Sequence, residues 1–212
     1  MRRSSPHNDF FHWIAPYYDT LVNLLTFGGY EKFLRKAVKI LAPQKGEKIL
    51  DICSGTGKAV SWMAEAVGEK GEVVGVDITQ SMINVAKEHY GALANVIFLK
   101  KDVTQPWEYR DHFDGIITSF SIHELPEKYR AGVLERCYSA LKGQGRMLIA
   151  DFHPQPLGMA KFFSLIFFKL FERRNISFLS FPQNETLKRA GFRKVRTFPV
   201  LGSVFQITLA QR

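Results

Sequence analysis

Short apolar runs alternate with amphipathic stretches along the first two-thirds of the chain. Five runs are almost continuously apolar and rich in β-branched residues, which is typical of central parallel strands covered on both faces. We therefore predict strands at 48–52, 73–76, 96–99, 113–118 and 147–150. Helices are predicted between them at 60–67, 81–89 and 127–141, the last ended by Lys142-Gly143 through a left-handed cap. This alternation predicts an α/β fold with a parallel sheet.

The pattern changes after residue 150. Pro154, Pro156 and Gly158 interrupt it, and apolar residues then recur from Met159 at the spacing of an amphipathic helix. The predicted buried stripe contains Phe162, Phe163, Ile166, Phe167, Leu170 and Phe171, while Leu165 and Phe168 fall on the other face. A short helix at 184–190, ending at Gly191, and two strands at 194–198 and 204–209 complete the chain. Because the link between these strands is short, we expect an antiparallel pair.

Basic and aromatic residues gather in the last third of the chain. Residues 142–212 hold 12 basic and 3 acidic side chains, whereas residues 1–141 hold 17 of each. Eight of the 18 phenylalanines lie between Phe152 and Phe181. This region is either a docking surface for an anionic partner or a solvated charged face around an ordinary core.

The composition narrows the class of protein. A length of 212 residues suits one domain. With 23% charged residues and a mean hydropathy of -0.10, neither wholesale disorder nor an integral membrane protein fits. The N-terminus lacks the apolar stretch of a secretory signal, so we expect a cytoplasmic protein. The two cysteines, Cys53 and Cys137, have no CxxC spacing and are expected to be reduced and buried, without a metal.

The segment Lys48–Gly57, KILDICSGTG, leads an apolar strand into a glycine-containing turn that opens a helix. Glycines in such a turn let a ligand approach the backbone N–H groups closely. About 20 residues later the second strand ends at Asp77, where a carboxylate can bind two ribose hydroxyls.

A nicotinamide dinucleotide would use a similar layout. Its fingerprint needs a third glycine or alanine, but the corresponding position counted from Gly55 is Val60. Asp51 also precedes the turn, where an acid disfavours a pyrophosphate and suits a cofactor that carries an ammonium and a sulfonium.

These motifs resemble those of the class I S-adenosylmethionine-dependent methyltransferases. Residues 51–57 resemble the first motif of that family, Asp77 its ribose-binding acid, Lys101-Asp102-Val103 its adenine-contacting turn, and 113–119 its fourth motif. The resemblance covers roughly residues 10–150 and the closing strand pair. It implies a Rossmann-like, seven-stranded, mostly parallel sheet with a C-terminal antiparallel pair and helices on both faces.

The N-terminal segment narrows the resemblance further. Ile14-Ala15-Pro16-Tyr17-Tyr18-Asp19, followed by Phe27-Gly28, is similar to the ubiquinone/menaquinone biosynthesis C-methyltransferases. Two departures stand out. Cys53 replaces a common glycine, which is tolerated if its φ is negative, and Ser121-Ile122-His123-Glu124 replaces an Arg-Asn pair common in the quinone enzymes, which counts against a quinone acceptor.

The resemblance implies a single methyltransferase domain over 1–212. It divides into a helical cap (1–45), a cofactor-binding core (46–152), a Phe-rich lid or insertion (153–182) and a closing helix and strand pair (183–212). The residues expected to bind S-adenosylmethionine are Asp51, Cys53, Ser54, Gly55, Gly57, Asp77, Ile78, Met82, Asp102, Val103 and Ser119.

Candidate residues for the chemistry lie outside that set. Tyr18 is expected to close the pocket, and His123 is a candidate general base. His123 and His153, with Asp151, could instead hold a metal or form an ordinary polar rim. Methyl transfer requires no metal.

We therefore expect methyl transfer from S-adenosylmethionine to a small apolar or lipid-like acceptor. The alternatives are a phospholipid amine N-methyltransferase, an RNA methyltransferase and a non-catalytic cofactor-binding module. The Phe-rich helix can serve as a lid over an apolar pocket, as a peripheral contact with an anionic membrane, or as plain core. Nucleic acid is not an expected partner, because the basic residues form no recognition module.

Overall fold

The structure, a computed structural model, describes residues 13–170 and 173–212. Its strands form a seven-stranded sheet in the order β3-β2-β1-β4-β5-β7-β6. The predicted α/β fold, a mostly parallel sheet with a C-terminal antiparallel pair, is confirmed. The chain divides into two compact units, residues 1–105 and 106–212, which are described in turn.

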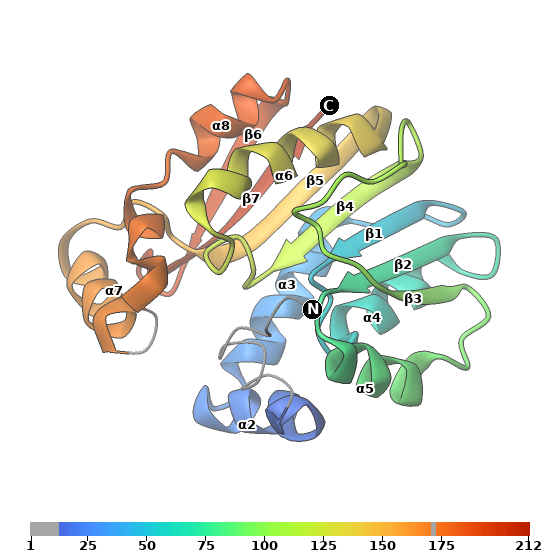
Figure 1. The fold of residues 1–212 in the computed structure, drawn as a ribbon, viewed down its shortest axis with the longest axis horizontal. Coiled ribbons are helices and arrows are strands. Elements are labelled where there is room, and N and C mark those ends of the chain that lie inside the picture. Colours follow the sequence, from blue (N-terminus) through green and yellow to red (C-terminus); the bar gives the residue numbers. More distant parts are fainter. Residues whose placement is uncertain (1–12, 171–172) are drawn as a thin grey trace. The chain divides into compact units, whose positions relative to one another are not determined.

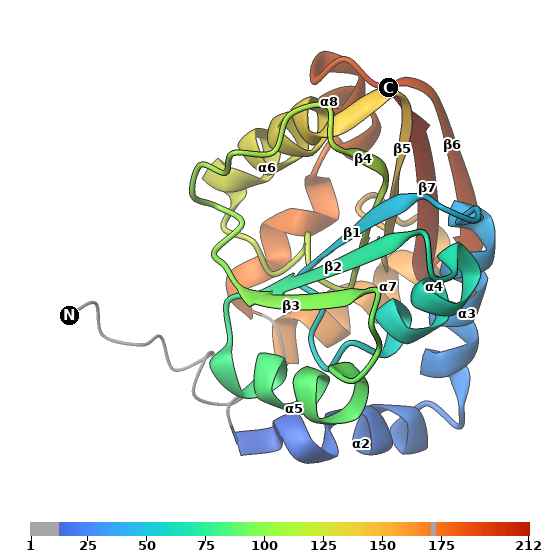
Figure 2. The ribbon, with the colours of Figure 1, turned by 90° about the vertical axis from the view of Figure 1, so that its right-hand side faces the viewer.

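Three parallel strands form the sheet of the first unit. They are β1 (Lys48–Ile52), β2 (Glu72–Asp77) and β3 (Val96–Lys100). The helices are α2 (Tyr18–Leu25), α3 (Gly29–Leu41), α4 (Lys58–Val67) and α5 (Gln80–Tyr90), preceded by the 3-10 helix η1 (Ala15–Tyr17). Helix α4 packs on β1 and β2 and also contacts α3, while α5 packs along β3 (Figure 2).

Local sequence explains where α4 begins. Gly57 has a φ of 79°, a left-handed conformation that L side chains rarely adopt, and the helix starts at the next residue. It therefore begins at Lys58, two residues before the predicted start at Val60. The face that carries Val60, Met63 and Val67 is buried against the sheet strands.

The second unit contains the antiparallel part of the sheet. It has β4 (Phe113–Ser119), β5 (Leu141–Phe152), β6 (Arg193–Val200) and β7 (Phe205–Gln211). Strand β7 pairs antiparallel with both β5 and β6, with Ile149 opposite Thr208. Helices α6 (Glu127–Ala140) and α8 (Gln183–Arg189) pack side by side, α6 against β5 and α8 against β6 (Figure 1).

The predicted end of α6 is wrong. No left-handed cap forms at Gly143; instead Leu141 is already extended, with φ -73° and ψ 148°, and begins β5. Leu141 is fully buried and pairs with Phe113 of β4, so strand pairing stabilises an extended backbone immediately after the helix. As a result β5 is 12 residues long, rather than the short strand predicted at 147–150.

The predicted buried stripe of the Phe-rich helix is also wrong. Helix α7 (Gly158–Leu170) buries Ala160, Ser164 and Phe168, whereas Phe162 and Phe163 are exposed. Phe168 stacks on Phe178 of the 3-10 helix η2 (Arg173–Ser180), and this contact determines which face turns inward. The side chains of Leu170 and Phe171 lie outside the described residues.

Within the described part of the chain, no helix is long and apolar enough to cross a membrane.

Candidate functional site

The glycine-containing turn after β1 is tied to the end of β2. The Ser54 N–H donates to the Val76 carbonyl at 2.9 Å, and the Gly55 N–H donates to Asp77 Oδ2 at 3.0 Å. The Gly57 N–H closes the turn on the Ser54 carbonyl at 3.0 Å. Five of the predicted cofactor-binding residues, Asp51, Ser54, Gly55, Gly57 and Asp77, therefore lie around one turn.

The two glycines serve different purposes. A Cβ at Gly57 would lie 2.7 Å from the Phe98 ring, so a larger residue there would force this buried ring to shift. A Cβ at Gly55 would meet no atom within 4 Å, although its φ of 52° still disfavours other residues. The turn is therefore packed on the Gly57 side and open at Gly55, where a ligand can approach the backbone.

Cys53 corrects two expectations. Its φ is 57°, not negative, so the residue occupies a left-handed conformation that favours glycine. It is also half-buried rather than buried, and it forms no disulfide with another described residue. Cys137, by contrast, is fully buried, and burial raises the pKa of its thiol to about 12.

Asp51 is an unpaired carboxylate in the core. It is 1% exposed, and neither of its oxygens has a hydrogen-bond partner among the described residues. Burial raises its pKa well above the ordinary value, and the charge of Asp77 raises this pKa further. A buried, unpaired carboxylate is unfavourable, so the site has the chemistry to accept a cationic group that donates hydrogen bonds. The ammonium of the expected cofactor fits this requirement, and its sulfonium adds a second positive charge.

Asp77 is held in place by backbone groups. Its Oδ1 accepts from the Thr79 N–H at 2.8 Å, while its Oδ2 accepts from Gly55. Each carboxylate oxygen has two lone pairs, so a fixed Asp77 can still accept from a ligand hydroxyl. The next residue, Ile78, is 44% exposed.

The N-terminal segment contacts the same turn. The Thr56 hydroxyl donates to Asp19 Oδ2 at 2.8 Å, and Asp19 Oδ1 is buried without a partner among the described residues. Tyr18, beside Asp19, lies edge-on to Tyr30 with ring centroids 6.2 Å apart. Tyr18 also packs against the buried cluster of Ala15, Met82 and Val85, so the predicted residue Met82 lies under the N-terminal segment.

Tyr30 belongs to this arrangement, and the sequence analysis missed it. Burial raises the pKa of its hydroxyl well above the ordinary value, and the nearby Tyr18, Asp19 and Asp51 raise this pKa further. The hydroxyl therefore stays protonated and can donate a hydrogen bond. Asp19 was also missed as a site residue, although its place next to Tyr18 in the family-like N-terminal segment was an available signal.

The predicted adenine-contacting turn follows β3. Asp102 Oδ1 accepts from the Thr104 N–H at 2.9 Å and from its hydroxyl at 2.7 Å, so this oxygen stabilises its own turn. The Lys101 N–H donates to the Asp77 carbonyl at 2.8 Å, which fixes the turn to the end of β2. Val103 is buried.

His123 and Asp151 form a buried pair in the second unit. His123 Nδ1 lies 2.6 Å from Asp151 Oδ1, and the His123 backbone N–H donates to Asp151 Oδ2 at 3.1 Å. Three phenylalanine rings contact the imidazole edge-on, namely Phe152, Phe168 and Phe178. The predicted residue Ser119 also lies in this unit, half-buried at the end of β4.

Arg130 is a third residue that the sequence analysis missed. Its side chain is buried, and its Nε donates to the Leu125 carbonyl at 3.0 Å and an Nη to the His123 carbonyl at 3.2 Å. Burial lowers the pKa of the guanidinium, whose carbon lies over the Phe178 ring at 5.3 Å from the centroid. Arg130 thus fixes the loop that carries His123. An arginine in a helix is usually exposed, so no pattern along the chain indicates this role.

His153 does not join the His123 pair by any hydrogen bond between described residues. Its Nδ1 accepts from the Gln155 N–H at 3.1 Å, and burial lowers its pKa. Over residues 13–170 and 173–212, no group of three His, Cys, Asp or Glu side chains is arranged to hold a metal ion.

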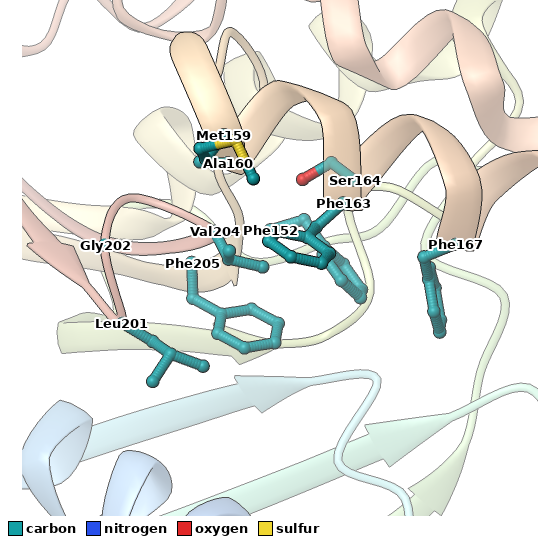
Figure 3. Close-up of a pocket in the computed structure, with 10 residues that line it drawn as sticks. All are labelled: Phe152, Met159, Ala160, Phe163, Ser164, Phe167, Leu201, Gly202, Val204 and Phe205. Carbon is teal, nitrogen blue, oxygen red and sulfur yellow. The ribbon is translucent and has the colours of Figure 1, made fainter.

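An apolar pocket lies between α7 and the turn that joins β6 to β7 (Figure 3). Its volume is about 510 Å³, within the range of small-molecule sites. It is lined by Phe152, Met159, Ala160, Phe163, Ser164, Phe167, Leu201, Gly202, Val204 and Phe205. Ser164 supplies the polar side chain of this lining, and its buried hydroxyl has no partner among the described residues. Phe152 both lines the pocket and contacts the His123 ring.

Comparison with known proteins identifies relatives. Residues 2–175 match the model of the ubiE/COQ5 methyltransferase family. A ubiquinone/menaquinone biosynthesis C-methyltransferase from Photorhabdus laumondii is 33% identical over 145 residues, which is 67% of this chain and 57% of that protein. Demethylmenaquinone methyltransferase from Staphylococcus aureus is 29% identical over 95% of this chain and 91% of its own length.

A solved structure supports the same grouping. A SAM-dependent methyltransferase from Aquifex aeolicus is 25% identical, with a TM-score of 0.65 over 84% of this chain and 88% of that one. Together these matches confirm the predicted resemblance, and with it S-adenosylmethionine as the expected cofactor.

Proposed function

Because the chain belongs to the ubiE/COQ5 methyltransferase family, we propose that it transfers a methyl group from S-adenosylmethionine to a small apolar acceptor. For the methyl donor, the observation that carries the proposal is the buried carboxylate of Asp51, which has no partner among the described residues. For the acceptor, it is the Phe-lined pocket of the second unit.

Residues of the first unit would hold the cofactor. Asp51 and the open backbone at Gly55 would bind its charged end, Asp77 its ribose hydroxyls, and the Asp102-Val103 turn its adenine. Tyr18 would close over it. When bound, S-adenosylmethionine supplies a methyl carbon bonded to a sulfonium, so the leaving group is already activated. The contribution of the protein is then mainly to align donor and acceptor and to exclude water.

The pocket lining supports an apolar acceptor. Phenylalanine, leucine, valine and methionine side chains favour an apolar ring or chain, and Ser164 offers one hydroxyl to a polar substituent. The Staphylococcus aureus relatives carry the name demethylmenaquinone methyltransferase, so a demethylated naphthoquinone is the first acceptor to test.

We assign His123 as the general base of the reaction. Asp151 accepts from the Nδ1–H tautomer, which makes Nε2 the basic nitrogen. His123 is 4% exposed, so proton transfer requires a neighbouring ring such as Phe152 to move aside. His123→Gln should lower kcat at least tenfold with little change in KM, and the kcat–pH profile should lose one ionisation. An unchanged profile would exclude this role.

Calorimetric titration tests the donor site. The wild-type chain should bind S-adenosylmethionine and S-adenosylhomocysteine, whereas Asp51→Asn should weaken binding at least tenfold because it removes the charge that the cofactor's cationic groups match. Absence of binding by the wild type would refute the proposal.

Mass spectrometry of reaction products tests the acceptor. The purified chain with labelled cofactor should methylate a demethylated naphthoquinone or a comparably apolar small molecule. Transfer to RNA or to a phospholipid amine, with none to apolar small molecules, would overturn the acceptor class while leaving the donor site intact.

A further inference from the structure

Helix α7, the residue that precedes it and the β6–β7 turn together expose an apolar surface. The residues that form it, hereafter the α7 face, are Leu157, Met159, Phe162, Phe163, Ile166 and Leu201. Leu157 is 81% exposed and Leu201 71%, while Phe162 and Phe163 are more than half exposed. Large apolar side chains grouped in this way mark a surface that another apolar phase covers.

The packing of α7 shows that this face is additional to the core contact. Ala160, Ser164 and Phe168 follow one another at four-residue spacing and are buried. At about 100° per residue, Phe162 and Ile166 point in another direction, away from that stripe. The helix is therefore apolar both toward the unit that it packs on and toward its surroundings.

Charges on and around α7 indicate what covers this face. Lys161 and Lys169 are exposed near the two ends of the helix. No acidic residue occurs between Phe152 and Phe171, and residues 142–212 hold 12 basic against 3 acidic side chains. An apolar helix face with flanking lysines is the pattern of a helix that lies in the headgroup region of a bilayer. We propose that the α7 face docks the protein on an anionic membrane.

The pocket opens within this face. Met159, Phe163 and Leu201 line the pocket (Figure 3), and all three are exposed residues of the α7 face. A molecule dissolved in the bilayer can therefore enter the pocket without crossing water. This route of entry rests on the proposed function, whereas the docking surface does not.

Vesicle flotation with the full chain tests docking. Vesicles of phosphatidylcholine alone are compared with vesicles in which about 30 mol% of the lipid is phosphatidylglycerol, which makes their surface anionic. The chain should float with the anionic vesicles and much less with the neutral ones. Raising the salt concentration should reduce binding, because exposed charges are screened.

Matched apolar substitutions locate the surface. The double variant Phe162→Ser/Ile166→Ser should lower the fraction bound at least tenfold. Leu93→Ser/Ile97→Ser is the control, because Leu93 and Ile97 are exposed apolar residues of the first unit with exposure similar to that of Ile166. It should float like the wild type.

Matched charge reversals test the electrostatic part. Lys161→Glu/Lys169→Glu should abolish the preference for anionic vesicles. Lys70→Glu/Lys87→Glu makes the same change in net charge at exposed positions of the first unit and should keep most of the binding.

Titration of every variant with S-adenosylmethionine separates this proposal from the previous one. Variants of the α7 face should bind the cofactor like the wild type, so vesicle binding and cofactor binding can fail independently. The docking proposal is wrong if the wild type does not bind anionic vesicles at low salt. It is equally wrong if Phe162→Ser/Ile166→Ser floats to the same extent as the control Leu93→Ser/Ile97→Ser. It is also wrong if light scattering shows a dimer that Phe162→Ser/Ile166→Ser converts to a monomer, since the face would then bind a second copy.

Discussion

At the scale of single residues, the turn after β1 combines two unfavourable features. Asp51 is buried without a partner among the described residues, and Cys53 holds a left-handed backbone conformation. Each lowers the stability of the free protein, and such local costs are common where a ligand is bound. Each also predicts a substitution that stabilises the fold.

Asp51→Asn should raise the free energy of unfolding of the ligand-free protein by about 1 to 3 kcal/mol, because it removes a buried unpaired charge. Urea denaturation at pH 8 measures this change. S-adenosylmethionine at 100 times its Kd should stabilise the wild type by about 2.7 kcal/mol and Asp51→Asn by far less. Glu88→Gln, at an exposed position of α5, is the control. Loss of stability in Asp51→Asn without cofactor would contradict the argument.

Cys53→Gly should stabilise the chain relative to Cys53→Ala. Both variants remove the thiol, but only glycine relieves the left-handed strain, which costs about 1 to 2 kcal/mol. The greater backbone entropy of glycine in the unfolded chain offsets roughly 0.5 to 1 kcal/mol of this gain. The thermal unfolding midpoint of Cys53→Gly should therefore be higher than that of Cys53→Ala. The reverse order would show that the backbone at Cys53 is not strained.

At the scale of elements, the loop after β4 depends on one buried side chain. Arg130 of α6 donates to the carbonyls of Leu125 and His123, and Asp151 of β5 accepts from His123. The helix, the loop and the strand are therefore joined through polar contacts as well as through the sheet.

Arg130→Lys should destabilise the protein by about 1.5 to 3 kcal/mol, because lysine keeps the charge but cannot span both carbonyls with a planar fork. Chemical denaturation measures the loss. Arg196→Lys, at an exposed position of β6, should change stability by much less. Equal effects at the two sites would show that the Arg130 contacts contribute little.

Several elements could be predicted from the sequence, and the failures have physical reasons. The strand at 48–52 and the antiparallel closing pair were correctly predicted, because apolar runs and a short link determine them locally. The predicted end of α6 was wrong because strand pairing between Leu141 and Phe113 overrides the local signal of Lys142-Gly143. The prediction of the buried face of α7 was wrong because both faces of the helix are apolar, and the spacing of apolar residues then does not show which face is buried.

The candidate site shows the same division. Asp51, Gly55 and Asp77 were predicted from a spaced motif, and the structure places them around one turn. The contacts of Tyr30 and Arg130 form only in the folded chain, so no spacing in the sequence indicates them.

At the scale of the whole molecule, pH acts through Asp51. Burial and the Asp77 charge raise its pKa above the ordinary 3.8. The free energy of unfolding of the ligand-free protein should therefore fall as pH rises from 3.8 through the raised pKa, because ionisation is costlier in the fold than in the unfolded chain. Affinity for S-adenosylmethionine should change in the opposite sense, falling as pH drops and the carboxylate becomes protonated.

Thermal unfolding measures how stability changes with pH, and calorimetric titration measures how the affinity for S-adenosylmethionine changes with pH. Asp51→Asn is the reference, which should show neither change. If the wild type and the variant show parallel pH dependence, another group is responsible.

The solitary carboxylate of Asp51 also has a consequence for the protein inside a cell. If S-adenosylmethionine compensates this core charge, as proposed above, the chain should sample open, protease-sensitive states more often when the methyl donor is scarce. Degradation should then remove the enzyme during methionine starvation and spare it when methionine is plentiful, so that the amount of enzyme follows the supply of its own reagent without a dedicated regulator.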